Sequence, residues 1–133
     1  MNLAEARRGK EQRVAKLQNA DRAVVELTKL TQYLLDIDHP QGGPKARFLA
    51  RFGFAIDNPG ALSKALVGHA CEHDISASRN TAYGTIIEVE GELDTPTGRR
   101  PVVRTVWSVD NGSDVPRLVT VVPIKSPLGG PPP

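Results

Sequence analysis

The chain has 133 residues, of which 39% are hydrophobic and 24% are charged, and its formal net charge is +2. These proportions are typical of one soluble globular domain and exclude a chain that is disordered throughout. The small positive charge permits a nucleic-acid partner without indicating one, and the few aromatic residues form no evident platform for stacked bases. No apolar run reaches the length of a membrane span and no signal-peptide pattern follows the first methionine. Neither a membrane helix nor an export address is therefore expected in the chain itself.

The two ends of the sequence differ in composition from its middle. Residues 1–22 are rich in basic and helix-favouring residues but lack a sustained apolar face, so a helical or partly ordered basic arm is expected. Residues 125–133 are rich in proline and glycine, which is the composition of a linker or tail. One domain is therefore expected over residues 23–124.

Three helices are predicted in the first half of this domain. Apolar residues at helical spacing predict the first over about 24–36, although its two leading valines could instead begin a short strand. The second is expected over 44–53, because a proline suits its first turn and a glycine can end it in a left-handed cap. The third is expected over 58–72, with asparagine as its N-cap and proline at its first position.

The periodicity changes after a polar interval at 73–82. Residues 83–93 alternate between apolar and acidic or polar side chains, as in a strand with one solvated face. Two further strands are expected over about 101–109 and 116–124, joined by the turn-forming residues 110–115. Helices followed by an antiparallel β-meander of three or four strands predict an α+β fold.

Alternation assigns the side chains of the last two strands to opposite faces. Arg104 is expected to lie opposite Thr105 and Trp107, and Arg117 opposite Thr120, unless a bulge intervenes. Two arrangements remain open, an anion site formed by the two arginines or a site formed by the two threonines. Paired guanidinium groups on a rigid sheet match the geometry of phosphate.

The same side chains also allow a purely structural interpretation. Glu88, Glu90 and Glu92 form an acidic row on the preceding strand and could pair with both arginines. The threonines are ordinary strand residues, and Trp107 fits a core position better than a stacking surface.

A second candidate site is the turn from His39 to Lys45, which runs through a Pro–Gln–Gly–Gly–Pro sequence into a helix. Backbone donors and the helix dipole favour an anion there, whereas Lys45 is unfavourable to the helix and so indicates a functional role. His39 can act as an acid or a base near neutral pH, although a His–Pro turn is often only structural. His69 and His73 lie four residues apart, but no third ligand is near, so no metal site is predicted.

Four runs of the sequence are similar to a bacterial domain of unknown function that is common in cyanobacteria. They are KLTQYLLDIDHPQGGPKARFLARFGF, ALVGHA, YGTIIEVEGELDTPTGRRPVVRTVW and DVPRLVTVVP, and the similarity covers about residues 23–124. That family also occurs at the C-termini of large polymorphic toxins and is often encoded beside a small partner protein. By its order of elements it resembles the barnase–EndoU–colicin–RelE superfamily of metal-independent ribonucleases.

The resemblance implies an RNA-cleaving toxin, with tRNA among its possible substrates, that acts in the bacterial cytoplasm and is neutralised by a cognate immunity or antitoxin protein. Delivery as part of a larger secreted protein is compatible with this role, and no metal or other cofactor is implied. The implied catalytic residues are His39, Lys45, Arg104, Thr105, Arg117 and Thr120. Substrate contacts are expected from Trp107 and Tyr83.

In the implied reaction His39 is the preferred base for the ribose 2′-hydroxyl, and the general acid is unassigned. The two arginines or Lys45 would stabilise the phosphorane, and Thr105 or Thr120 would hold the phosphate. Two alternatives remain, a non-catalytic module that binds RNA or protein, and an antitoxin or immunity protein whose acidic row mimics nucleic acid.

Overall fold

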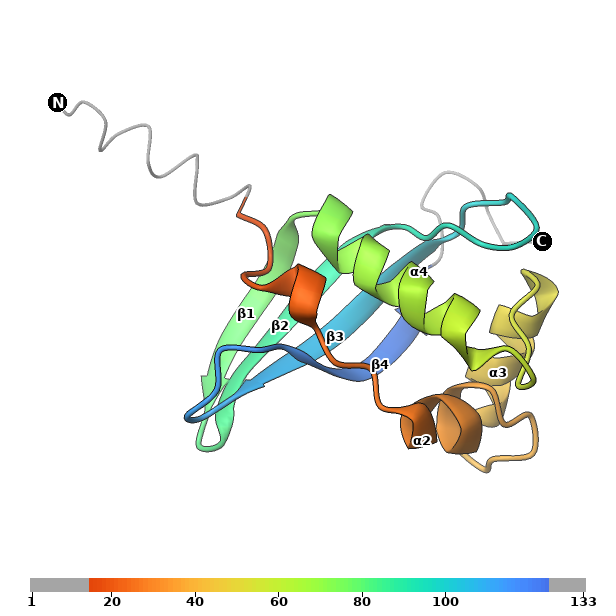
Figure 1. The fold of residues 1–133 in the computed structure, drawn as a ribbon, viewed down its shortest axis with the longest axis horizontal. Helices are drawn as coiled ribbons and strands as arrows, with labels where there is room; N and C mark the ends of the chain where they lie inside the picture. The colour runs from red at the N-terminus through yellow and green to blue at the C-terminus, as the bar shows by residue number, and fades with distance from the viewer. Residues whose placement is uncertain (1–14, 125–133) are drawn as a thin grey trace, which may run out of the picture.

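A computed structural model describes residues 15–124 of the chain and confirms the expected α+β fold, with helices preceding a four-stranded antiparallel sheet (Figure 1). Residues 1–14, which make up most of the expected basic arm, lie outside the described residues. So does the expected tail at 125–133. The helical elements are η1 (Ala20–Arg22), α2 (Leu27–Lys29), η2 (Leu30–Leu34), α3 (Gly43–Arg51) and α4 (Pro59–Glu72).

The first predicted helix is shorter than expected at its start. Val24 forms a parallel bridge to Arg117, in which its N–H donates to the Pro116 carbonyl at 2.8 Å and its carbonyl accepts from the Leu118 N–H at 2.9 Å. A backbone that is paired with a strand cannot also form helical hydrogen bonds. The predicted helix therefore begins only at Leu27, and α2 continues directly into the π-helical turn η2.

Helices α3 and α4 confirm the second and third predicted helices. Helix α3 has proline in its first turn, and Gly53 follows its end with a φ of 98°, a left-handed conformation that favours glycine. Helix α4 begins with Pro59 after Asn58, although the Asn58 side chain makes no capping hydrogen bond. Within residues 15–124, no helix is long and apolar enough to cross a membrane.

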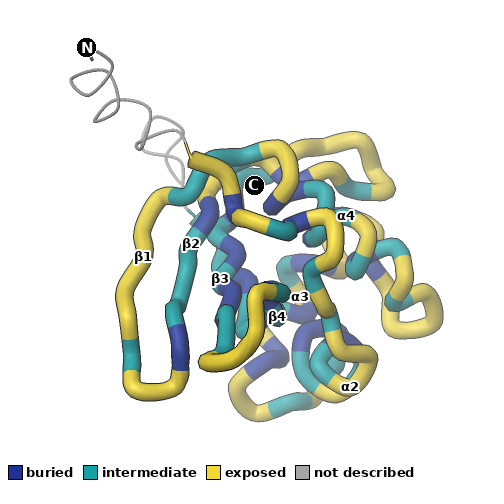
Figure 2. The backbone as a smooth tube through the Cα atoms, turned by 60° about the vertical axis from the view of Figure 1, so that its left-hand side comes forward, coloured by how far each residue is buried: buried dark blue, intermediate teal, exposed yellow. Residues whose placement is uncertain are grey.

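The sheet has the order β1 (Ile75–Thr81), β2 (Gly84–Glu92), β3 (Val102–Asp110) and β4 (Arg117–Pro123). Strand β1 was not predicted, since the sequence indicated only a polar interval at 73–82. It is an edge strand with five consecutive exposed residues, so it needs no alternating apolar pattern (Figure 2). Backbone pairing with β2 makes it a strand.

The core lies between the sheet and α4, which crosses one face of the sheet (Figure 1). Val103, Thr105 and Trp107 of the central strand β3 point into it and are 0% exposed. Leu17 and Ala20, which fall in the segment expected to be an arm, are also buried in this core. The opposite face of the sheet, here called the open face, carries no helix in Figure 1.

A β-bulge interrupts β4 and changes which of its side chains share a face. Trp107 pairs with Leu118 and Val106 pairs with Thr120, so Val119 is an extra residue without a partner on β3. Strict alternation, which places Leu118 and Thr120 on one face, is therefore wrong for β4. Leu118 is buried against the core beside its partner Trp107, whereas Thr120 takes the face of Val106.

Because of the bulge, Arg117 and Thr120 share the open face with Arg104. Arg117 pairs with Ser108 and Thr120 pairs with Val106, and both partners are alternate residues of β3 that share a face with Arg104. The predicted threonine and tryptophan of β3 point the other way, into the core. The meander thus separates the predicted residues into an open-face set and a buried set.

Candidate functional site

Lys45 joins three elements at the β4 edge of the sheet. It lies in the first turn of α3, and its Nζ donates to the Thr120 hydroxyl at 2.7 Å and to the Tyr33 hydroxyl at 3.1 Å. The same Nζ lies 5.4 Å from the centroid of the Tyr33 ring, and the Nζ of Lys29 lies 5.9 Å from it. Two ammonium groups therefore flank one phenol.

His39 completes this group, which we call the Lys45 cluster (Tyr33, His39, Lys45 and Thr120). The His39 and Tyr33 rings meet edge to face with centroids 5.1 Å apart. The structure thus brings together three residues predicted from the sequence, His39, Lys45 and Thr120, around a tyrosine that was not predicted.

The hydrogen bonds of His39 define its tautomer. Its Nδ1 accepts the backbone N–H of Gln41 at 3.0 Å and that of Gly42 at 2.8 Å. Because an amide N–H can only donate, Nδ1 carries no proton and the neutral ring is protonated at Nε2. A ring held in this way offers a donor at Nε2 and has no free lone pair with which to act as a base.

The glycine pair before Lys45 allows the turn to pack closely. A Cβ atom on Gly42 would run into the backbone carbonyl of Tyr33, and one on Gly43 would run into the carbonyl of Ile37. These contacts hold the start of α3 against η2 and the segment after it. The Gly–Gly sequence is thus what brings Lys45 within reach of Tyr33.

Tyr33 has a pKa below its usual value of 10.0. Burial alone would raise this pKa, but hydrogen bonds with Lys45 and Thr120 and the positive charges of Lys45 and Lys29 outweigh it. A phenol with a lowered pKa beside an ammonium group can transfer a proton or bind next to an anion. The one feature of the sequence that points to Tyr33 is Lys29, which lies four residues earlier on a predicted helix and therefore on the same side of it.

Arg104 is held by the acidic row, as the structural interpretation of the sequence allowed. Its Nε and one terminal nitrogen each lie 2.7 Å from a carboxylate oxygen of Glu90, and Nε lies 3.5 Å from Glu88. By register, Arg104 faces Val122 across the strand pair and is therefore a diagonal neighbour of Thr120 on the open face.

Arg117 has a partner outside the acidic row. It forms two hydrogen bonds of 3.2 Å with the carboxylate of Asp110, which also accepts the Ser108 hydroxyl at 2.7 Å. The hydrogen bonds from Arg117 and Ser108 lower the pKa of Asp110. The two arginines therefore do not form the adjacent pair that the sequence left open.

Thr105 and Trp107 belong to a buried polar chain. The Trp107 indole N–H donates to the Thr105 hydroxyl at 2.9 Å, Thr105 lies 3.1 Å from Nδ1 of His69, and Nε2 of His69 lies 3.1 Å from the Gly91 carbonyl. An indole only donates and a carbonyl only accepts, so the chain runs in one direction, with the His69 proton on Nε2. Every polar side-chain atom in it has a partner.

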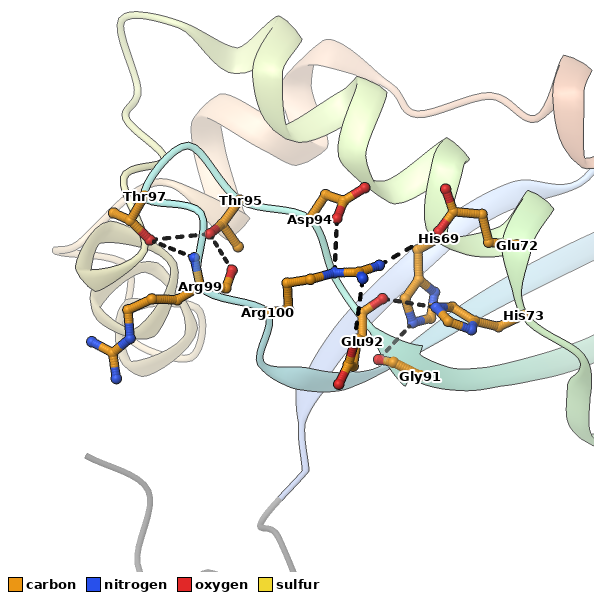
Figure 3. A network of polar contacts seen from close by, with 10 residues as sticks. All are labelled: His69, Glu72, His73, Gly91, Glu92, Asp94, Thr95, Thr97, Arg99 and Arg100. Atoms are coloured by element: carbon orange, nitrogen blue, oxygen red, sulfur yellow. Dashed lines mark hydrogen bonds and ion pairs between the residues drawn. The ribbon is translucent and has the colours of Figure 1, made fainter.

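Burial lowers the pKa of His69 to about 4, although its hydrogen bond with Gly91 opposes the shift. The neighbouring His73 ring lies 4.8 Å away and bonds to the Glu92 carbonyl at 2.8 Å (Figure 3). In both histidines, Nε2 therefore forms a hydrogen bond with a backbone carbonyl. Among residues 15–124, no three histidine, cysteine or carboxylate side chains are grouped to hold a metal ion.

Tyr83 lies far from the Lys45 cluster. It is 83% exposed in the turn between β1 and β2, and its carbonyl accepts the Asn111 N–H from the turn between β3 and β4. Figure 1 shows these turns at the end of the sheet away from α3. Trp107 is also outside the cluster, because it is fully buried in the core.

Comparisons with known proteins agree with the fold. Residues 16–125 match the family described as "Domain of unknown function (DUF6883)". None of the curated proteins compared with this sequence matches it. Among solved structures, a chain of a contact-dependent growth inhibition toxin–immunity protein complex from Klebsiella pneumoniae 342 has a TM-score of 0.62 and 18% identity. The alignment covers 77% of this chain and 100% of that one, which shows a shared fold.

Proposed function

Because the chain belongs to the DUF6883 family, whose function is unknown, we propose its role from its site: a metal-independent ribonuclease that cleaves RNA through the ribose 2′-hydroxyl. The observation that carries this proposal is the Lys45 cluster. It combines a tyrosine with a lowered pKa, an ammonium group, a hydroxyl and an imidazole donor at one edge of the sheet. These groups can supply the base, the positive charge and the hydrogen-bond donors for phosphoryl transfer without a metal.

In the proposed reaction, Tyr33 in its phenolate form accepts the proton of the 2′-hydroxyl. The 2′-oxygen attacks the adjacent phosphorus, and Lys45 stabilises the negative charge of the phosphorane. Thr120 and Nε2 of His39 donate hydrogen bonds to the phosphate oxygens. The bond to the 5′-oxygen then breaks, that oxygen takes a proton from water, and a 2′,3′-cyclic phosphate remains.

Arg104 extends this site along the open face. It lies diagonally from Thr120 and its guanidinium is one-third exposed, with a side-chain relative exposure of 35%. A phosphate next to the scissile one can compete with Glu90 for this guanidinium. Arg117, which is held by two bonds to Asp110, keeps the turn between β3 and β4 in place.

A toxin role is supported by the likeness in fold to a chain of a toxin–immunity complex. In that role the domain acts in a bacterial cytoplasm after delivery as part of a larger protein. A cognate immunity protein that covers the Lys45 cluster neutralises it.

The proposal is tested by incubating the purified full chain with bacterial RNA, including tRNA, in excess EDTA and sequencing the RNA ends. We expect fragments with 2′,3′-cyclic phosphate and 5′-hydroxyl ends. Tyr33→Phe and Lys45→Gln should each lower the cleavage rate by about 100-fold or more. Lys64→Gln removes the same charge from an exposed position on α4 and should leave the rate unchanged.

Thermal unfolding separates lost chemistry from lost folding, since both cluster variants should melt within a few degrees of the wild type. Intact RNA with folded wild-type protein would contradict the proposal. Stable binding to a partner protein in that case would instead indicate a binding module or the immunity half of such a pair.

A further inference from the structure

A groove of about 560 Å³ lies on the outer side of α3, and its lining is positively charged. It is lined by Ile37, Pro44, Arg47, Phe48, Ala50 and Arg51. Two of these residues are cations and none is acidic. Helix α3 as a whole has Lys45, Arg47 and Arg51 as its charged residues, so an anionic ligand meets no repulsion along this helix.

The charged and apolar parts of the groove alternate along α3. Arg47 and Arg51 are one helical turn apart, about 6 Å along the axis, and therefore project from the same side. The half-buried ring of Phe48 lies between them in sequence, with the Arg51 guanidinium 5.7 Å from its centroid. Ile37 adds a second apolar wall that is 50% exposed.

Arg47 is an available cation in this groove. It is exposed, and its guanidinium forms no hydrogen bond or ion pair with another residue among those described. By contrast, Arg104 and Arg117 are both paired with carboxylates. An exposed arginine beside an aromatic ring suits a phosphate and an adjacent base.

The groove begins beside the Lys45 cluster, at the turn that leads into α3. Pro44, in its lining, directly precedes Lys45. Ile37 lies at the other side of the same turn, where its carbonyl contacts Gly43. An RNA strand that is bound at Lys45 can therefore pass the first turn of α3 and enter the groove.

We propose that this groove binds the nucleotides next to the cleaved bond of single-stranded RNA. Arg47 and Arg51 contact its phosphates, and Phe48 stacks against a base. The choice of RNA as the anion rests on the ribonuclease function proposed above. A volume of this size accommodates a ligand of nucleotide dimensions, and its mixed cationic and apolar lining fits a nucleotide better than a purely acidic peptide.

The test is the binding of a fluorescein-labelled single-stranded 2′-O-methyl oligonucleotide to the full chain, because this probe cannot be cleaved through its 2′-oxygen. Arg47→Gln should weaken binding by about fivefold to tenfold and reduce the salt slope of log K by about 0.7, the value for one lost phosphate contact on a single strand. Arg79→Gln removes the same charge from the exposed edge strand β1 and should change affinity less than about twofold. Phe48→Leu should weaken oligonucleotide binding while inorganic polyphosphate binding is retained.

Each outcome bears on a definite part of the proposal. Equal affinity and equal salt slope for Arg47→Gln and wild type would overturn it, even if the wild type cleaves RNA. Polyglutamate that binds as tightly as the oligonucleotide, with the same dependence on Arg47, would assign the groove to an acidic protein and also overturn it. Oligonucleotide binding that depends on Arg47 without RNA cleavage would support the groove and contradict only the ribonuclease function.

Discussion

Among single residues, His69 couples the stability of the fold to pH. Its pKa is about 4 in the folded protein, against the usual 6.5 in an unfolded chain. Between these values the unfolded chain binds a proton that the folded chain does not. The stabilisation that comes from keeping His69 neutral in the folded protein is therefore complete above about pH 6.5. It is lost as the pH falls toward 4 and changes little below that pH.

We expect the free energy of unfolding to fall by about 3 kcal/mol over this interval because of His69 alone. Urea unfolding at about pH 7.5 and about pH 4.5 measures it. The His69→Gln variant should show a shallower pH slope whatever its stability at neutral pH. An unchanged slope in this variant would contradict the assignment.

The sequence identified part of the Lys45 cluster for physical reasons. Lys45 was marked because a cation in the first turn of a helix is unfavourable, and His39 because it can titrate near neutral pH. Tyr33 was not predicted, because Lys29 at helical spacing is a weak signal by itself and the contact with Lys45 joins residues far apart in the sequence. Its lowered pKa is a property of tertiary contacts.

At the scale of elements, the glycine pair before α3 determines how closely this helix approaches η2. Ala in place of Gly42 puts a methyl group against the Tyr33 carbonyl, although the φ of −87° at this residue suits any amino acid. We expect Gly42→Ala to lower the free energy of unfolding by about 1–3 kcal/mol. It should also slow RNA cleavage, because Lys45 moves away from Tyr33.

Gly60 provides the matched control for this substitution. Its Cβ would meet nothing within 4 Å, so Gly60→Ala should leave stability unchanged or raise it by up to about 1 kcal/mol. Chemical denaturation of both variants under the same conditions measures the difference. Equal effects of the two substitutions would show that the close approach at Gly42 carries no energetic weight.

Periodicity predicted the elements that have one buried face and failed where tertiary contacts decide. Helices α3 and α4 and strands β2, β3 and β4 all repeat apolar residues at their own period. Strand β1 has no such repeat, because its residues are exposed on both sides at the sheet edge. The bulge in β4 could not be predicted from the sequence either, because the alternation of side chains does not show which residue of a strand lacks a partner.

At the scale of the whole molecule, helices and sheet share one core, in which Trp107 is central. This residue is the single tryptophan of the chain and is 0% exposed. Its fluorescence therefore reports on core packing, while far-ultraviolet circular dichroism reports on helices and strands.

We expect both signals to change in one coincident transition on denaturation, as in a small two-state domain. Leu66→Ala, which removes a fully buried side chain of α4, should shift both curves equally and lower stability by about 2–5 kcal/mol. If helix and core signals separated, with circular dichroism lost before fluorescence, the helices and sheet would be independent units.

The extra residue in β4 also has a consequence for how relatives of this chain are compared. Leu118 and Thr120 pair with adjacent residues of β3, so Val119 is an inserted residue that the pairing of the two strands does not use. A homologous protein that lacks the residue equivalent to Val119 would keep the threonine equivalent to Thr120 on the open face. A gap placed elsewhere in the strand would move the threonine to the core face in the comparison and remove it from the site. Where a relative is one residue shorter in β4, its alignment with this chain should place the gap at Val119.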